Sequence, residues 1–416
     1  MSLKRVVVTG LGALTPLGNN VPRFWDNLLK GVSGANPITH FNPEKFKTRF
    51  ACELKDFDIL QYIDRKEARK IDPCTQYALA ATYEALENSG IQLDKVDLER
   101  VGVILGTGIG GMTTVMEPLE EFFSSGGVPR FGPFFITKVL ADMIPGIISI
   151  HFGLQGPNYT TTSACASSAN AIVDAYHFIQ LGKADIIISG GSEACISEPV
   201  LGGFNAMHAL STRNDDYATA SRPFDLDRDG FVMGEGSAIL ILEEYEHAIR
   251  RGAHIYAEIA GVGITADAYH ITLPQPEGRG VIRCMKQAVE DGKMKLTDID
   301  HINAHGTSTP PGDITECKAI EDLFGEHTPN VLVTSIKSMT GHLLGAAAAA
   351  ESIATIMALQ EGIVPPTINQ FTVDPNIPEL NFVRNKAVKK DIHAAISNSF
   401  GFGGHNVSIL YRKYES

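Results

Sequence analysis

The tract from Thr161 to Ser168 places one cysteine, Cys165, among small hydroxyl and methyl side chains. Residues 156–159 are typical of a turn and a strand, and residues 169–176 are typical of an apolar helix. Cys165 is therefore expected between a strand and a helix N-terminus, where the helix dipole and free N–H groups favour a thiolate. Lone cysteines are more often buried and inert. The interpretation of Cys165 as a nucleophile thus depends on what the rest of the chain supplies.

Two histidines and a lysine lie in polar or glycine-containing tracts further along the chain. His305 follows an apolar strand and precedes a Gly-Thr-Ser-Thr run, although a histidine in such a loop can simply cap a turn. Lys337 and His342 precede the alanine run 346–350, and both side chains are costly to bury unless they are paired. Glu351 is the first charge after the alanines, so we expect it to have a buried partner or a bound cation.

A glycine-rich tract with two aromatic residues lies near the end of the chain, at residues 398–406. Its glycines allow the backbone to approach a ligand, Phe400 and Phe402 are placed to gate a pocket, and a backbone N–H can form half of an oxyanion hole. The alternative is a surface turn whose aromatic rings pack into the core. Together with Cys165, the histidines and the lysine, this tract favours thiolate attack on a thioester or ester, followed by stabilisation of a second oxyanion.

The elements that must position these residues alternate between strand-like and helix-like segments, which indicates an α/β protein. Four strand-then-polar segments recur in the same order: 5–12 with 256–263, 101–108 with 302–307, the strand before Cys165 with 331–335, and 186–191 with 395–400. This order predicts two similar halves, residues 1–252 with the cysteine and residues 253–416 with the histidines and the lysine. In paired α/β halves, ligands bind where the carboxyl ends of the strands face a shared crevice.

Composition excludes some classes of function. The chain has 416 residues, enough for two or three domains, with 44% hydrophobic and 20% charged residues. A net charge of −13 argues against a general nucleic-acid or anionic-membrane binder. The six cysteines have neither zinc-site nor disulfide-framework spacing, and neither a signal peptide nor a membrane-spanning segment is expected. A reducing, cytoplasmic location is therefore expected.

Two other motifs are weak. Gly106–Gly111 matches the dinucleotide pattern G-x-G-x-x-G, but the following residues do not form a convincing βαβ unit, and chance matches are common in a chain with 40 glycines. Asp225–Gly230 matches the start of a calcium loop, but its twelfth position is Gly236 instead of glutamate. We therefore predict neither a nicotinamide site nor an EF-hand.

Six tracts, read together, resemble those of a known family: 163–167, 221–225, 229–236, 305–309, 337–342 and 398–404. The chain resembles the β-ketoacyl-acyl carrier protein synthases over essentially its whole length, and is most similar to their elongating branch. The resemblance implies the thiolase-like fold, in which two similar α/β halves form a five-layered αβαβα arrangement. It also implies a homodimer.

The resemblance implies a role for each residue singled out above. Cys165 attacks the thioester of an acyl-acyl carrier protein, and the backbone N–H groups of Cys165 and Phe402 form the oxyanion hole. His305 and His342 act on malonyl-acyl carrier protein, so that loss of carbon dioxide leaves an enolate that attacks the acyl group. Lys337 orients and tunes both histidines.

The same resemblance implies the surroundings of the reacting groups. Phe400 and Phe402 lie in a gating loop, and Ile109 lines the acyl tunnel. Thr307 and Thr309 contact the phosphopantetheine arm. Chain-length preference is left open, because the depth of the tunnel depends on packing around Ile109.

The family requires no organic cofactor but has a position for a structural monovalent cation, sodium or potassium. The matching residues here are Asn303, Ala304, Glu351, Ser397 and Asn398. The locally basic residues Lys66, Arg69 and Lys70 are usually a solvated helix face, but the resemblance makes them a docking site for an acidic acyl carrier protein.

Sequence differences between the branches of this family indicate which branch the chain resembles most. The initiating branch has asparagine where this chain has His342, which favours elongation. Degradative thiolases have a second cysteine near the last glycine-rich loop, where this chain has His405. Chain-length factors lack the nucleophile, which is present here. A condensing subunit of a polyketide or other specialised pathway stays an alternative, as does a catalytically idle dimer partner.

Overall fold

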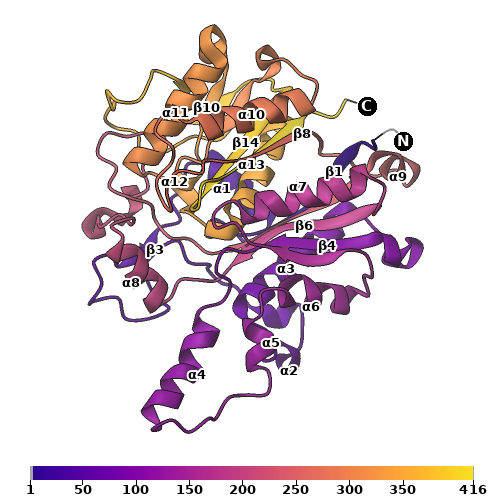
Figure 1. Ribbon diagram of the computed structural model, residues 1–416. Coiled ribbons are helices and arrows are strands. Elements are labelled where there is room, and N and C mark those ends of the chain that lie inside the picture. Colours follow the sequence, from indigo (N-terminus) through magenta and orange to yellow (C-terminus); the bar gives the residue numbers. More distant parts are fainter. Residues whose placement is uncertain (1–2, 416) are drawn as a thin grey trace.

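The computed structural model describes residues 3–415 and contains two halves with one strand pattern (Figure 1). The sheet order is β5-β4-β6-β7-β1 in the first half and β10-β9-β14-β15-β8 in the second. In each half the first three strands of this order are parallel, and the next two pairings are antiparallel. The first-half strands are β1 (Val6–Leu14), β4 (Val101–Gly106), β5 (Asn158–Thr161), β6 (Ile186–Glu193) and β7 (Gly236–Glu244). Those of the second half are β8 (Ala257–Ala266), β9 (His301–Asn303), β10 (Leu332–Thr334), β14 (Ala394–Gly401) and β15 (His405–Arg412).

The four segment pairs predicted from the sequence coincide with β1 and β8, β4 and β9, β5 and β10, and β6 and β14. The duplication is therefore confirmed, and β7 and β15 add a fifth pair that the sequence comparison missed. β1 and β8 also pair with each other over three residues, Val6–Val8, which joins the two sheets edge to edge. The division of the chain after residue 252 stays a prediction.

Helices cover the sheets in five layers, as Figure 1 shows. The central layer is α7 (Ser167–Gln180) and α13 (Ala347–Glu361), which contact each other and strands of both halves. α3 (Pro73–Ser89) and α6 (Met143–Phe152) cover the outer side of the first sheet, and α10 (Arg279–Asp291) and α11 (Pro310–Phe324) cover that of the second. The predicted thiolase-like αβαβα architecture is therefore confirmed.

Small residues bring the central layer close to the strands that surround it. The four alanines at the start of α13 are at most 2% exposed, as their small side chains let the helix pack against α7. At the end of β4, a Cβ on Gly106 would lie 2.3 Å from the backbone of Ser167. The first turn of α7 is thus held against the strand ends, and this contact fixes the position of the Cys165 loop relative to the sheet.

The remaining elements connect these layers. α4 and α5 project from the body of the molecule (Figure 1). The helices are α1 (Val21–Leu29), α2 (Arg65–Ala68), α4 (Thr113–Ser124), α5 (Phe135–Val139), α8 (Glu198–Ala206), α9 (Tyr245–Arg250) and α12 (Lys337–Thr340). The short strands are β2 (Asn36–Pro37), β3 (Phe50–Ala51), β11 (Ile363–Val364), β12 (Asn381–Phe382) and β13 (Val388–Lys389). Within residues 3–415, no helix has the length and apolar character needed to span a bilayer.

Candidate active site

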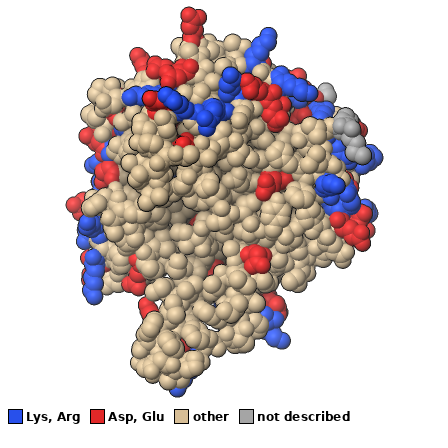
Figure 2. Space-filling model, in the orientation of Figure 1, with Lys and Arg blue, Asp and Glu red and all other residues tan. Residues whose placement is uncertain are grey.

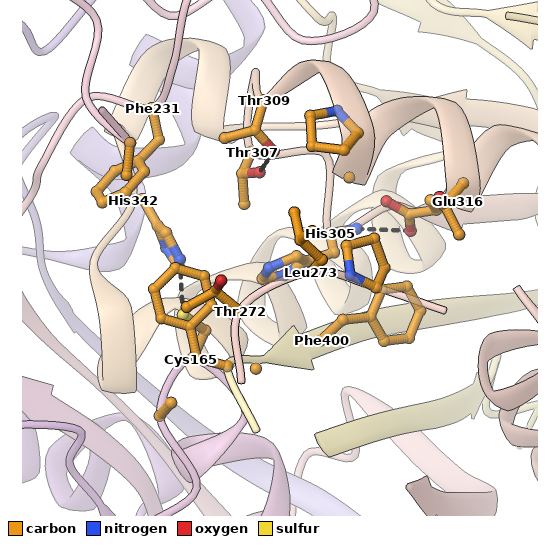
Figure 3. A pocket seen from close by; sticks show the side chains of 18 of the residues that line it. Cys165, Phe231, Thr272, Leu273, His305, Thr307, Thr309, Glu316, His342 and Phe400 are labelled. Carbon is orange, nitrogen blue, oxygen red and sulfur yellow. Dashed lines mark hydrogen bonds between the residues drawn. The ribbon is translucent and has the colours of Figure 1, made fainter. Parts of the chain in front are cut away.

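A pocket of about 430 Å³ opens at the carboxyl ends of the strands and brings together the tracts that the sequence singled out (Figure 3). Cys165 reaches it from the loop after β5, His305 from the loop after β9, and His342 from the segment after α12. Phe400 enters from the end of β14. The predicted convergence of these residues, from both halves of the chain, is therefore present.

The cysteine and the two histidines are in direct reach of one another. The Cys165 Sγ lies 3.0 Å from His342 Nε2, and one donor atom from each of Cys165, His305 and His342 lies within 4.8 Å of the others. The two imidazole rings are 5.4 Å apart and nearly perpendicular. The thiol is thus placed to donate its hydrogen to His342, and a group bonded to sulfur would lie beside His305.

Burial favours the neutral form of the Cys165 thiol. Burial raises the pKa of Cys165 to about 12, although Lys337 and the Phe402 backbone N–H act to lower it. Burial thus opposes the thiolate expected from the helix start, and α7 begins two residues after Cys165, at Ser167. Burial and Lys337 hold the pKa of His342 well below its usual range. A neutral imidazole is accordingly available to accept the thiol proton during attack.

Lys337 lies beside His305 and is almost fully buried. Its Nζ is 3.4 Å from His305 Nδ1 and forms an ion pair with Glu351 from α13. The expectation that Lys337 and Glu351 each need a buried partner is confirmed, as each is the partner of the other. Because an ammonium group can only donate, its hydrogen bond to Nδ1 leaves the imidazole hydrogen of His305 on Nε2.

The glycine-rich loop packs against the nucleophile. The Phe402 backbone N–H lies close enough to the Cys165 sulfur to act against the rise in the pKa of its thiol. A Cβ on Gly401 would lie 3.3 Å from the Cys165 backbone nitrogen, and the Ser399 hydroxyl donates to the Cys165 carbonyl at 3.0 Å. The Gly401–Phe402 backbone thus passes beside the Cys165 backbone, and the oxyanion hole formed by the two N–H groups stays a prediction.

The other predicted pocket residues also line this cavity. Ile109 lies in the loop after β4 and is 41% exposed, while Phe400 has its ring 5.7 Å from that of His305. Thr307 and Thr309 lie on the wall with their hydroxyl oxygens 2.9 Å apart. This geometry fits the gate, tunnel and pantetheine positions that the resemblance implies, while their roles stay predictions.

Sequence reasoning missed the carboxylate that holds the His305 turn. Glu316, on α11, accepts hydrogen bonds from the backbone N–H groups of His305 and Gly306, each at 2.8 Å (Figure 3). Its side chain is 2% exposed, and the Asn398 amide donates to it at 3.3 Å. The available signal was a glutamate on a helix that follows the histidine loop directly, but sequence alone does not show that its side chain turns inward.

The tract 221–225 is likewise structural support for the pocket. The Ser221 hydroxyl donates to the Lys337 carbonyl at 2.6 Å, and the Phe224 backbone N–H donates to Asp313 at 2.9 Å. Asp313 pairs in turn with Arg228, whose Nε is 3.2 Å from its carboxylate. This buried network ties the lysine segment to α11.

Not every predicted site residue reaches the pocket. Lys66 and Arg69 are exposed on and just after α2, and Lys70 is paired with Glu67. The predicted cation residues gather elsewhere, where β9 and β14 lie side by side: Asn303 is opposite Ser397 in the strand pairing. Neither group lines the cavity that holds Cys165.

This architecture, with a buried cysteine and two histidines at the centre of paired α/β halves, is that of a thiolase-like condensing enzyme. Residues 3–248 match the family described as Beta-ketoacyl synthase, N-terminal domain, and residues 256–371 match the corresponding C-terminal domain. The chain belongs to the β-ketoacyl synthase family, and it is a condensing acyltransferase.

Curated relatives and solved structures agree with this assignment. The chain is 47% identical over 412 residues to a 3-oxoacyl-[acyl-carrier-protein] synthase 2 of Synechocystis sp. and 48% identical over 413 residues to that of Staphylococcus aureus, covering 99% of each chain. A β-ketoacyl synthase from Burkholderia phymatum superposes with a TM-score of 0.92 at 35% identity, over 99% of this chain and 100% of that one. A type II polyketide ketosynthase in complex with its acyl-carrier protein gives a TM-score of 0.92 at 34% identity, with full coverage of both chains.

Proposed function

We propose that this enzyme is a 3-oxoacyl-acyl carrier protein synthase that extends acyl chains by two carbons in fatty acid synthesis. The observation that carries the proposal is the 3.0 Å contact between Cys165 Sγ and His342 Nε2 at the wall of a pocket that also holds His305. The fatty acid pathway is favoured over a polyketide pathway because the relatives named for it are 47–48% identical, against 34% for the polyketide ketosynthase.

Acyl transfer is the first half of the proposed reaction. His342 Nε2 accepts the proton of the Cys165 thiol as the sulfur attacks the thioester carbonyl of acyl-acyl carrier protein. The backbone N–H groups of Cys165 and Phe402 stabilise the oxyanion as it forms. When the intermediate collapses, the carrier thiol leaves with the proton from His342, and the acyl group stays on Cys165.

Condensation is the second half. His305 donates its Nε2 hydrogen to the thioester oxygen of malonyl-acyl carrier protein, and His342 faces the same group from the other side. The carbon–carbon bond to the carboxylate breaks, carbon dioxide leaves, and the enolate carbon attacks the acyl-Cys165 carbonyl. The carbon–sulfur bond to Cys165 then breaks, and the released thiolate regains a proton from solvent through His342.

A coupled product assay tests this proposal. Purified protein is incubated with octanoyl- and malonyl-acyl carrier protein, and carbon dioxide and the carrier-bound product are measured together. We expect one carbon dioxide for each 3-oxodecanoyl chain formed. Absence of product from folded protein would contradict the proposal and favour an idle dimer partner. A cytoplasmic location is part of the proposal, supported by the six cysteines, all of them unpaired and buried.

The proposed docking site for the acidic carrier protein is the exposed basic surface at α2. Lys66 and Arg69 are exposed there, whereas the charge of Lys70 is partly offset by Glu67. A groove of about 350 Å³ beside them is lined by three basic residues, Arg65, Arg69 and Lys138, one acidic residue, Glu117, and neutral side chains. These cations are a local exception on an acidic protein, and they complement an acidic partner.

Reversing one charge at this surface is expected to weaken carrier binding without changing the chemistry. Arg69→Glu should raise KM for acyl-acyl carrier protein about tenfold at low salt, with kcat unchanged. The effect should shrink as salt is added, and it should be absent with an acyl-pantetheine substrate that lacks the protein. Lys286→Glu on α10, an exposed lysine of the opposite half, is the control. An equal rise in KM for acyl-acyl carrier protein and for acyl-pantetheine would contradict docking of the carrier protein at this surface.

The proposed homodimer is supported by apolar side chains on α4, α5 and α6. Phe123 is 73% exposed, Ile136 63% and Ile150 75%. Figure 2 shows that the projecting lobe formed by α4 and α5 has few charged side chains on its visible face. Exposed apolar surface of this kind is typical of a protein interface, and a second copy of the chain is the proposed occupant.

Introducing a charged side chain on this apolar surface should dissociate the dimer. Light scattering of the wild-type protein is expected to give twice the mass of one chain at micromolar concentration. Ile150→Glu should weaken association by about 2 kcal/mol or more, enough to produce monomer. Ile249→Glu on α9, a 43% exposed isoleucine of another surface, should stay dimeric. A monomeric wild type would overturn the proposal.

The proposed cation site fits the unpartnered oxygen atoms beside Lys337. Asn303 Oδ1 and Glu351 Oε2 are buried without a hydrogen-bond partner, and the Asn303 amide donates to the Glu351 carbonyl at 3.1 Å. Oxygen donors of this kind suit sodium or potassium, with Ala304, Ser397 and Asn398 completing the proposed set. The Asn398 side-chain oxygen already accepts the Ser408 hydroxyl at 2.7 Å.

Exchange of the cation should therefore change stability. At equal ionic strength, potassium or sodium chloride is expected to raise the unfolding midpoint by about 2 °C or more over choline chloride, because choline is too large for a buried site. Asn303→Leu should remove the difference. Equal midpoints for the wild type in all three salts would contradict a bound cation.

A further inference from the structure

Glu193 is a fully buried glutamate at the end of β6 that has no part in the chemistry described above. Its carboxylate accepts hydrogen bonds from five neutral donors on two separate loops. They are the Thr107 hydroxyl at 3.1 Å and the backbone N–H groups of Gly108 at 2.8 Å, Ile109 at 2.9 Å, Gly110 at 2.5 Å and Gly345 at 2.8 Å. Convergent N–H groups of this kind are how a fold satisfies a buried anion.

The two loops held by this carboxylate form two walls of the pocket. The first loop places Ile109 in the cavity that contains Cys165, and the second follows His342 by three residues. Their backbones are in contact, because a Cβ on Gly345 would lie 2.1 Å from the Gly108 nitrogen. Glu193 therefore fixes the wall that meets the acyl chain relative to the histidine that activates the nucleophile.

A carboxylate is required by the pattern of donors. All five partners donate hydrogen, so each needs an oxygen acceptor. Glutamine has the same shape but would direct its NH₂ group at some of these N–H groups, and the charge that strengthens the bonds would be lost. Glu193→Gln is accordingly expected to release the loop at residues 108–110 with little change of volume.

We propose that Glu193 is a positioning residue that fixes Ile109 relative to His342 and Cys165, and that it thereby sets which acyl chain lengths the pocket accepts. This inference rests on the proposed condensing function. With the carboxylate in place, a long chain must fit around a rigid Ile109. Without the carboxylate, the loop at residues 108–110 can move, and kcat/KM for long acyl chains rises relative to kcat/KM for short ones.

A double-mutant cycle on chain-length preference tests this role. The wild type, Glu193→Gln, Ile109→Ala and the double variant are compared by kcat/KM with octanoyl- and tetradecanoyl-acyl carrier protein. Each single change is expected to raise the ratio of long-chain to short-chain kcat/KM at least fivefold. The double variant should show no larger ratio than the stronger single variant, because both changes act on the same wall.

A purely structural role gives a different pattern. A purely structural role of Glu193 would lower kcat/KM for the octanoyl and the tetradecanoyl substrate by the same factor, and that result would overturn the proposal. The proposal would also be overturned if the long-to-short ratio of the double variant equalled the product of the changes in the two single variants. Glu53→Gln is the matched control, because Glu53 is also buried and also accepts backbone N–H groups, those of Thr39 and His40 outside the pocket. An equal ratio change in this control would also overturn it.

Two further outcomes are distinguishable. If Glu193→Gln does not fold, Glu193→Asp keeps the charge one methylene shorter, and it should shift the ratio in the same direction; an unchanged ratio would contradict the role. Absence of product from the wild type with either donor would overturn the proposed condensing function itself. If the wild type is active but the effects of Glu193→Gln and Ile109→Ala on the chain-length ratio are independent, only the role of Glu193 is overturned.

Discussion

Cys165→Ala is expected to abolish chain elongation while leaving malonyl decarboxylation measurable. The sulfur is the only atom in the proposed reaction that holds the acyl group, so kcat/KM for condensation should fall about 10⁴-fold or more. His305 and His342 stay in place, because the alanine removes one atom from the pocket wall and leaves their backbone contacts intact. Carbon dioxide release and carrier-bound product, measured in the same reaction, separate the two activities.

The control for this variant is another buried cysteine. Cys284 lies on α10, is fully buried and does not line the pocket, so Cys284→Ala should retain condensation. If Cys165→Ala also lost decarboxylation while its unfolding midpoint and circular dichroism matched the wild type, the assignment of decarboxylation to the histidines would be wrong.

Lys337→Met is expected to lower both stability and activity. It leaves Glu351 buried without its ion-pair partner, which costs about 3–5 kcal/mol of unfolding free energy. It also removes the donor that keeps the hydrogen of His305 on Nε2, so decarboxylation should slow by about 10²-fold or more. Denaturant unfolding and carbon dioxide release measure the two effects.

A double variant separates these effects. Lys337→Met with Glu351→Leu removes both buried charges, and it should recover most of the lost stability. Activity should stay low, because the contact with His305 is still missing. Recovery of activity together with stability would show that Lys337 acts only on the fold, and a stable single variant would show that the ion pair is unimportant.

Much of the site was predictable because its residues lie in short tracts of unusual composition. Cys165 and His305 each follow a predicted strand, and the duplication of strands places them with His342 at one crevice, where Lys337 contacts His305 from outside the pocket lining. The alanine run 346–350 lets α13 pack closely against α7, because only small side chains fit where the two helices meet.

What the sequence did not predict depends on side-chain direction and on burial. The helix start near Cys165 favoured a thiolate, but the depth of the pocket, which raises its pKa, is a property of the assembled fold. Glu316 and Glu193 look like ordinary acidic residues in the sequence, and their roles depend on N–H groups brought to them by distant loops. The glycines at 106–111, which resemble a dinucleotide motif, instead adjoin the buried carboxylate of Glu193.

The most direct test of the central claim is the mass of the enzyme after reaction with the first substrate alone. Protein is incubated with octanoyl-acyl carrier protein, quenched in acid and digested, and the peptide containing Cys165 is analysed by tandem mass spectrometry. We predict one octanoyl group per chain, located on Cys165, that disappears when malonyl-acyl carrier protein is added before the quench. No acyl group, or an acyl group on another residue, would contradict the account.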